Sequence, residues 1–117
     1  MVEVIKIEDA PVIPREIGSM KPLIDEKIGA SKLGIIFREI PARTPTLRMH
    51  YHVARESVYI GVEGKAKATV DGKEIIIEPN TIVLILPGEK HKVKNIGDIS
   101  FKMIEVYSPI EPDRIDV

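Results

Sequence analysis

Short apolar runs separated by frequent turn signals dominate this sequence. Pro and Gly recur along the chain, with one Asp-Gly pair at 71–72, and the runs between them are rich in Val and Ile. Such runs are typical of β-strands, and no segment keeps a convincing helical period. We expect strands over residues 2–7, 33–40, 46–53, 58–62, 65–70, 74–78, 82–86, 91–95 and 100–107, with an extended tail over 108–117. This pattern predicts an all-β sandwich or barrel in one domain over residues 1–117.

Two of the expected strands, 75–77 and 82–86, are apolar on both faces. Such a strand needs cover on both sides. One face would pack inside the barrel, and the other would be covered by the N-terminal segment or by a second subunit. Segment 10–28 is interrupted by Pro and Gly, which predicts an irregular wrapping arm. Because a chain of 117 residues has little spare segment to cover the outer strand faces, we expect a homodimer.

Composition excludes several classes of function. A net charge of −1, with three Tyr, two Phe and no Trp, provides neither a basic field nor a stacking surface, so we expect no nucleic-acid partner. The absence of Cys excludes disulfides and thiolate metal sites. We see no signal peptide and no run long enough to span a membrane, so we expect a cytoplasmic protein with no membrane partner. The lack of Gln and scarcity of Asn are typical of thermophile proteins.

The histidines are the residues that point to chemistry. His50 and His52 are one residue apart in an expected strand, so both rings lie on one face with their backbones roughly 7 Å apart. His91 follows a Pro87-Gly88 turn, and an antiparallel barrel can bring it opposite this pair. Three imidazoles facing one point form a transition-metal site with open positions. The competing interpretation is that each histidine is solvated or hydrogen-bonded without a metal.

The spacing of these histidines resembles the two motifs of the cupin family. The first is His50 to Gly64, HYHVARESVYIGVEG, and the second is Asn80 to Asn95, NTIVLILPGEKHKVKN. The resemblance implies a small single-domain cupin with a double-stranded β-helix, or jelly-roll, barrel, preceded by an N-terminal strand and the wrapping arm. It also implies that His50, His52 and His91 bind one divalent ion of Fe, Mn, Zn or Ni.

A fourth ligand in the family is a carboxylate of the first motif. In this sequence, two ways of counting along the motif place it at different residues. Counting forward from His52 places it at Glu56, whereas counting back from Gly64 places it at Ser57. Glu56 shares a strand face with apolar Val58 and other apolar residues, which favours Glu56 as the inward residue. Without it, the ligands would be three histidines and water.

Four further residues are candidates for substrate contacts. Arg48 shares a face with the two histidines of its strand and could hold a carboxylate or phosphate, although a solvated charge is an equal alternative. Tyr59, Phe101 and Met103 could line the cavity, with plain core packing as the alternative for each.

The resemblance implies a metal-dependent enzyme, an oxidoreductase or isomerase, that acts on a small organic acid, sugar or related metabolite. The residues do not distinguish among dioxygenase, isomerase and lyase chemistry. One alternative is a non-catalytic module that binds or senses a small molecule. The other is a metal-free barrel in which the histidines have no function.

Overall fold

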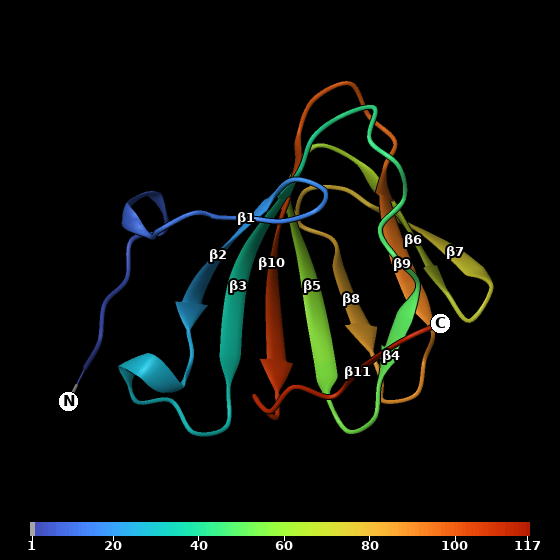
Figure 1. The fold of residues 1–117 in the computed structure, drawn as a ribbon. Helices are drawn as coiled ribbons and strands as arrows, with labels where there is room; N and C mark the ends of the chain where they lie inside the picture. The colour runs from blue at the N-terminus through green and yellow to red at the C-terminus, as the bar shows by residue number, and fades with distance from the viewer. Residues whose placement is uncertain (1) are drawn as a thin grey trace.

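The computed structural model describes residues 2–117, and these form two antiparallel sheets (Figure 1). One sheet has six strands in the order β1-β2-β3-β10-β5-β8, and the other has five in the order β11-β4-β9-β6-β7. The strands are β1 Ile13–Pro14, β2 Ser19–Ile24, β3 Gly34–Ile40, β4 His50–His52, β5 Glu56–Glu63, β6 Ala66–Val70, β7 Lys73–Ile77, β8 Ile82–Ile85, β9 His91–Asn95, β10 Phe101–Ser108 and β11 Arg114–Asp116. Two single-turn 3₁₀ helices, η1 Ile7–Asp9 and η2 Glu26–Ile28, lie in the N-terminal segment. The all-β jelly-roll prediction is confirmed.

Turn chemistry explains where the strands end. Asp71 and Gly72 both have positive φ, of 47° and 82°, which is the backbone of a tight hairpin between β6 and β7. Asn80, with φ of 68°, makes the turn before β8. Gly88, with φ of 82°, makes the turn that leads into β9 and therefore into His91.

The N-terminal segment differs from the prediction. Residues 2–6 form no strand and Ile7 already begins η1; residues 2–6 are exposed because no strand pairs with them. The N-terminal strand lies instead within the expected arm, where β2 pairs with β3 despite Pro22. A register shift between Pro22 and Ile24 accommodates the missing N–H. The arm therefore extends the six-stranded sheet at the edge opposite β8.

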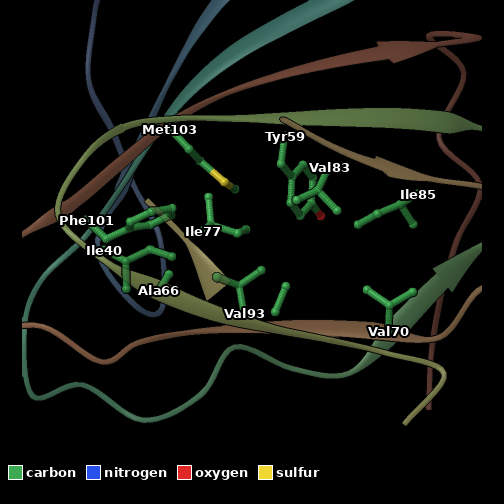
Figure 2. Close-up of a cluster of buried hydrophobic side chains, with 11 residues drawn as sticks. Ile40, Tyr59, Ala66, Val70, Ile77, Val83, Ile85, Val93, Phe101 and Met103 are labelled. Atoms are coloured by element: carbon green, nitrogen blue, oxygen red, sulfur yellow. The ribbon is translucent and has the colours of Figure 1, made fainter. Parts of the chain in front are cut away.

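A hydrophobic core fills one part of the space between the sheets (Figure 2). Phe101 and Ile40 are fully buried at paired positions of β10 and β3. Tyr59, Val93 and Met103 belong to the same cluster, and they also line the cavity described below. The core is therefore the floor on which the candidate site rests. Within residues 2–117, no helix has the length and apolar character needed to cross a membrane.

Candidate metal centre

The three histidines converge on one point. β4 places His50 and His52 on the same face, and its register with β9 sets His50 directly opposite His91. The ring centroids of His50 and His91 are 4.2 Å apart, and those of His50 and His52 are 5.1 Å apart. One ring nitrogen of each residue lies within 4.8 Å of the others. The three side chains are therefore positioned to hold a metal ion.

The Nδ1 atom of every histidine is held by an oxygen. His50 Nδ1 lies 3.0 Å from the Arg48 carbonyl, and His91 Nδ1 lies 2.8 Å from the Glu89 carbonyl. His52 Nδ1 lies 2.8 Å from Oδ1 of Asp113. A carbonyl or carboxylate oxygen only accepts hydrogen bonds, so each Nδ1 donates and each Nε2 keeps its lone pair. Nε2 is then the ligand atom of all three rings.

His91 shows that a metal ion fits this donor set. Its Nε2 is buried and has no hydrogen-bond partner among residues 2–117. A buried polar atom without a partner costs free energy, and native proteins rarely keep one without a reason. A transition-metal ion would satisfy this nitrogen together with the Nε2 atoms of the other two rings.

Burial keeps the histidines in the form that binds a metal. Burial lowers the pKa of His50 to about 4, and the Arg48 carbonyl only partly opposes this effect. Burial is also the main cause that lowers the pKa of His52 and of His91. The guanidinium of Arg114 lowers the pKa of all three rings further. Near neutral pH the rings are therefore neutral, as metal ligation requires.

Asp113 holds His52 from the C-terminal tail. Its carboxylate accepts hydrogen bonds from His52 Nδ1, from the Ala54 N–H at 2.7 Å and from the Arg55 N–H at 2.9 Å. Burial acts to raise the pKa of Asp113, but these hydrogen bonds outweigh it and keep the pKa below its usual range. A carboxylate behind a histidine ligand fixes the orientation of the ring and raises its basicity.

The tail is anchored so that Asp113 stays in place. β11 pairs with β4, and Arg114 lies opposite His52 in that register. Arg55 donates to the carbonyls of Pro109, Ile110 and Glu111, at 3.3, 2.7 and 3.2 Å. Its guanidinium also stacks 4.1 Å from the centre of the Tyr107 ring.

A cavity of about 700 Å³ lies in front of the histidines. The five-stranded sheet contributes the histidines, and the six-stranded sheet contributes Tyr59 and Glu105. Arg114 also lines the cavity. Burial raises the pKa of Glu105, and burial together with the Glu105 charge raises that of Tyr59 well above its usual value. The cavity therefore has imidazoles on one wall and the ionisable side chains of Tyr59 and Glu105 on the other.

The family model described as "Cupin domain" matches residues 37–107. This match covers both motifs and most of the barrel. The chain belongs to the cupin domain family.

Similar proteins carry this domain in different settings. The mannose-1-phosphate guanylyltransferase of Salmonella montevideo is 41% identical over 61 residues, which are 52% of this chain and only 12% of that protein. The tetracenomycin polyketide synthase protein TcmJ of Streptomyces glaucescens is 24% identical over 109 residues, or 92% of this chain and 73% of that protein. The polyketide cyclase RemF of Streptomyces resistomycificus has a TM-score of 0.82 at 23% identity, covering 100% of this chain and 86% of that one. The RemF likeness shows the cupin fold alone.

Glu56 lies outside the cluster of this cupin, which corrects the predicted fourth ligand. Its side chain is exposed, whereas Ser57 is only 2% exposed and Tyr59 is buried beside the core. Ser57 and Tyr59 therefore face inward, and Glu56 faces outward with Val58. The parity argument was wrong because the more apolar face of β5, with Val58 and Ile60, points outward.

Arg48 and Phe101 also lie elsewhere. Arg48 has a 60% exposed side chain that pairs with Glu16 at 3.5 Å and with Asp116 at 3.9 Å, in a hollow beside the cavity. Phe101 is fully buried in the core and does not line the cavity, because Met103 lies between it and the open space along β10. Tyr59 and Met103 do line the cavity, and their contact with a substrate stays a prediction.

The sequence analysis missed Glu105, Asp113 and Arg114. A signal existed for Glu105, since it shares strand parity with Phe101 and Met103, which were predicted to face inward. No local pattern marks the other two, because their positions depend on pairing between β11 and β4 across 61 residues of chain.

Proposed function

We propose that this cupin is a metal-dependent enzyme that acts on a small organic acid, a sugar or a related metabolite. One observation carries the proposal: three neutral imidazoles direct free nitrogens toward a cavity of about 700 Å³. A cavity of that volume suits a ligand of metabolite size. His50, His52 and His91 would hold the ion, and iron, manganese, zinc and nickel all suit imidazole ligands. When bound, such an ion supplies Lewis acidity toward a substrate oxygen.

The protein's own groups would bind and orient the substrate. Arg114 lines the cavity, and its charge acts on all three histidines. Its Nε is engaged by Asp116 at 2.7 Å, which leaves the terminal nitrogens for a carboxylate or phosphate of the substrate. Tyr59 and Met103 would support the substrate from the floor of the cavity. The anchored tail would limit the entry of water.

The similar proteins support enzymatic chemistry. RemF is named a polyketide cyclase, and TcmJ is named a polyketide synthase protein. Both names refer to oxygen-rich carbon skeletons, and a substrate of that kind would present an oxygen to the three histidines.

The proposed location is the cytoplasm.

A second candidate function is a non-catalytic module that binds a small molecule. The observation in its favour is that the matching region makes up only 12% of the Salmonella guanylyltransferase. In such a protein the cupin region can accompany a catalytic region located elsewhere.

Elemental analysis of tag-free protein tests the metal centre. The His52→Ala variant removes one ligand, and Glu56→Ala is the matched control, since this carboxylate faces outward on β5, the next strand in the chain. We expect about one transition-metal ion per chain in the wild type and in the control, and none in His52→Ala. Circular dichroism would verify that all three proteins fold.

Two results would contradict the metal centre. One is a His52→Ala variant that keeps its metal, and the other is a wild type that binds none of the four metals when they are supplied. Incubation with candidate metabolites then separates the two functions. An enzyme yields product over long incubation, whereas a binding module retains its ligand unchanged.

A further inference from the structure

Glu105 is a carboxyl group without an ionic partner in the cavity. It lies on β10, which runs between β3 and β5 in the six-stranded sheet and is therefore held on both sides. Among residues 2–117, no cationic nitrogen lies within 4.0 Å of its oxygens. Asp113, by contrast, is bound by three hydrogen-bond donors. A carboxyl group left unpaired in a cavity costs stability, so its presence needs an explanation.

Three arginines act on Glu105 through their charge, but none of them forms an ion pair with it. Arg38 on β3 donates to the carbonyls of Ser19 and Ile17, at 2.9 and 3.0 Å. Arg55 donates to the carbonyls of the C-terminal tail. Arg114 on β11 pairs with Asp116. All three favour the ionised carboxylate through their charge, although none forms an ion pair with it.

The remaining neighbours are on β5: Ser57, whose hydrogen bond acts to lower the pKa of Glu105, and Tyr59, directly opposite Glu105 in the strand register. Burial dominates over all these groups and raises the pKa of Glu105. The carboxyl group is therefore able to exchange a proton closer to neutral pH than an exposed glutamate can.

Glu105 and the histidines lie on opposite sheets that line the same cavity. The histidines belong to β4 and β9 in one sheet, and Glu105 belongs to the other. Both line the same cavity, and Glu105 is not among the residues whose ligand atoms cluster. A substrate in the cavity would therefore lie between the imidazoles and this carboxyl group.

We propose that Glu105 is a catalytic residue that transfers a proton to and from a carbonyl-containing substrate. This proposal rests on the proposed function. The carboxylate takes the proton from a carbon next to the carbonyl group, and the C–H electron pair becomes the C=C bond of an enolate. The π pair of the carbonyl moves onto its oxygen, on the side of the three histidines. Glu105 then returns the proton to the substrate, so the step needs no oxidant or reductant.

Hydrogen–deuterium exchange provides the test. The metal-loaded protein is incubated in D₂O with pyruvate, 2-oxobutyrate and dihydroxyacetone as probes, and loss of the C–H signal next to each carbonyl is followed by NMR. We expect the wild type to exchange at least one probe faster than buffer. The Glu105→Gln variant should be slower by about 100-fold or more, which is the usual contribution of a proton-transfer group. Glu105→Asp should keep part of the rate, and Glu56→Gln should match the wild type.

A thermal melt distinguishes catalysis from a structural role. Gln keeps the shape of Glu and removes the unpaired charge, so Glu105→Gln should melt at an equal or higher temperature. A structural carboxylate would give the opposite shift. No exchange by the metal-loaded wild type, equal exchange by Glu105→Gln, or a lower melting temperature for this variant would each overturn the proposal. Failure of the proposed function would appear separately, as a wild type without bound metal.

Discussion

Asp113 shows how much one side chain contributes to the centre. His52 and Asp113 are far apart in the sequence, yet their side chains meet at 2.8 Å. The same carboxylate accepts two backbone N–H groups, so it cannot turn away without breaking these hydrogen bonds as well. Asp113 is therefore a positioning residue that acts through His52.

Replacing Asp113 by Asn should weaken metal binding. The Asn side chain keeps the size of Asp but loses its charge. It has one acceptor oxygen in place of two, so it cannot accept all three hydrogen bonds in the same arrangement. We expect the affinity for a divalent metal to fall by about 10–100-fold, as measured by competition with a chelator. Asp116→Asn is the control, because Asp116 is exposed on β11, shortly after Asp113 in the chain, and its carboxylate binds Arg114. An equal loss in both variants would contradict the role of Asp113.

The histidines should also make the stability of the metal-free protein depend on pH. The pKa of His50 is about 4 in the folded protein, below its ordinary value of 6.5. The unfolded chain therefore binds more protons in this range, and stability should fall as the pH drops from about 6.5 to about 4. Glu105 acts in the opposite direction, because its raised pKa favours the folded state as the pH falls.

The comparison of wild type with His50→Gln isolates the contribution of His50. We expect urea denaturation to give a smaller loss of unfolding free energy between pH 6.5 and 4 in the variant. Parallel curves for the two proteins would show that His50 titrates normally in the folded state.

Strand β5 links the two sheets through a close backbone approach. Gly61 faces the turn after β7, where its N–H donates to the Thr81 carbonyl and its carbonyl accepts from Asn80. A Cβ atom at this position would collide with the Glu78 carbonyl oxygen, which is backbone and cannot swing aside. β5 can therefore pass this turn only with Gly at position 61.

The Gly61→Ala substitution should accordingly destabilise the fold by about 1–3 kcal/mol, the usual cost of forced overpacking. Gly97→Ala is the matched control, because a Cβ there meets its nearest neighbour at an ordinary 3.6 Å. Chemical denaturation of both variants provides the measurement. A Gly61→Ala variant as stable as the control would show that the turn can move.

The molecule as a whole leaves an apolar surface uncovered. β8 is an edge strand, and its outward residues Ile82 and Leu84 are 68% and 56% exposed. The N-terminal arm lies at the opposite edge of this sheet, so it does not provide the cover that β8 needs. A second copy of the chain could pair along the free edge with the same surface, which is the usual symmetric arrangement. We therefore still expect a homodimer.

Light scattering at micromolar protein concentration measures the oligomeric state. We expect the wild type to have twice the mass of the chain, and Leu84→Lys to be a monomer, because a charge would be buried in the contact. Ile76→Lys is the control, since Ile76 is exposed on β7 in the other sheet. A monomeric wild type, or a dimer that persists in Leu84→Lys, would count against the β8 surface.

Several features follow from local chemistry. Asp71-Gly72 makes a hairpin wherever its flanking strands pair, because both residues tolerate positive φ. Similarly, the one-residue spacing of His50 and His52 places their rings on one face of any strand. Local chemistry also predicted the turn at Pro87 and Gly88 and the strand that begins at His91.

Other features were decided only by the tertiary structure. The outward face of β5 is the more apolar one, so only packing against the second sheet determined that Ser57 and Tyr59 face inward and Glu56 outward. The positions of Asp113 and Arg114 depend on pairing between β11 and β4, and the opposition of Glu105 to the histidines depends on how the two sheets face each other. Periodicity is a property of a few neighbouring residues, whereas these contacts join segments far apart in the chain.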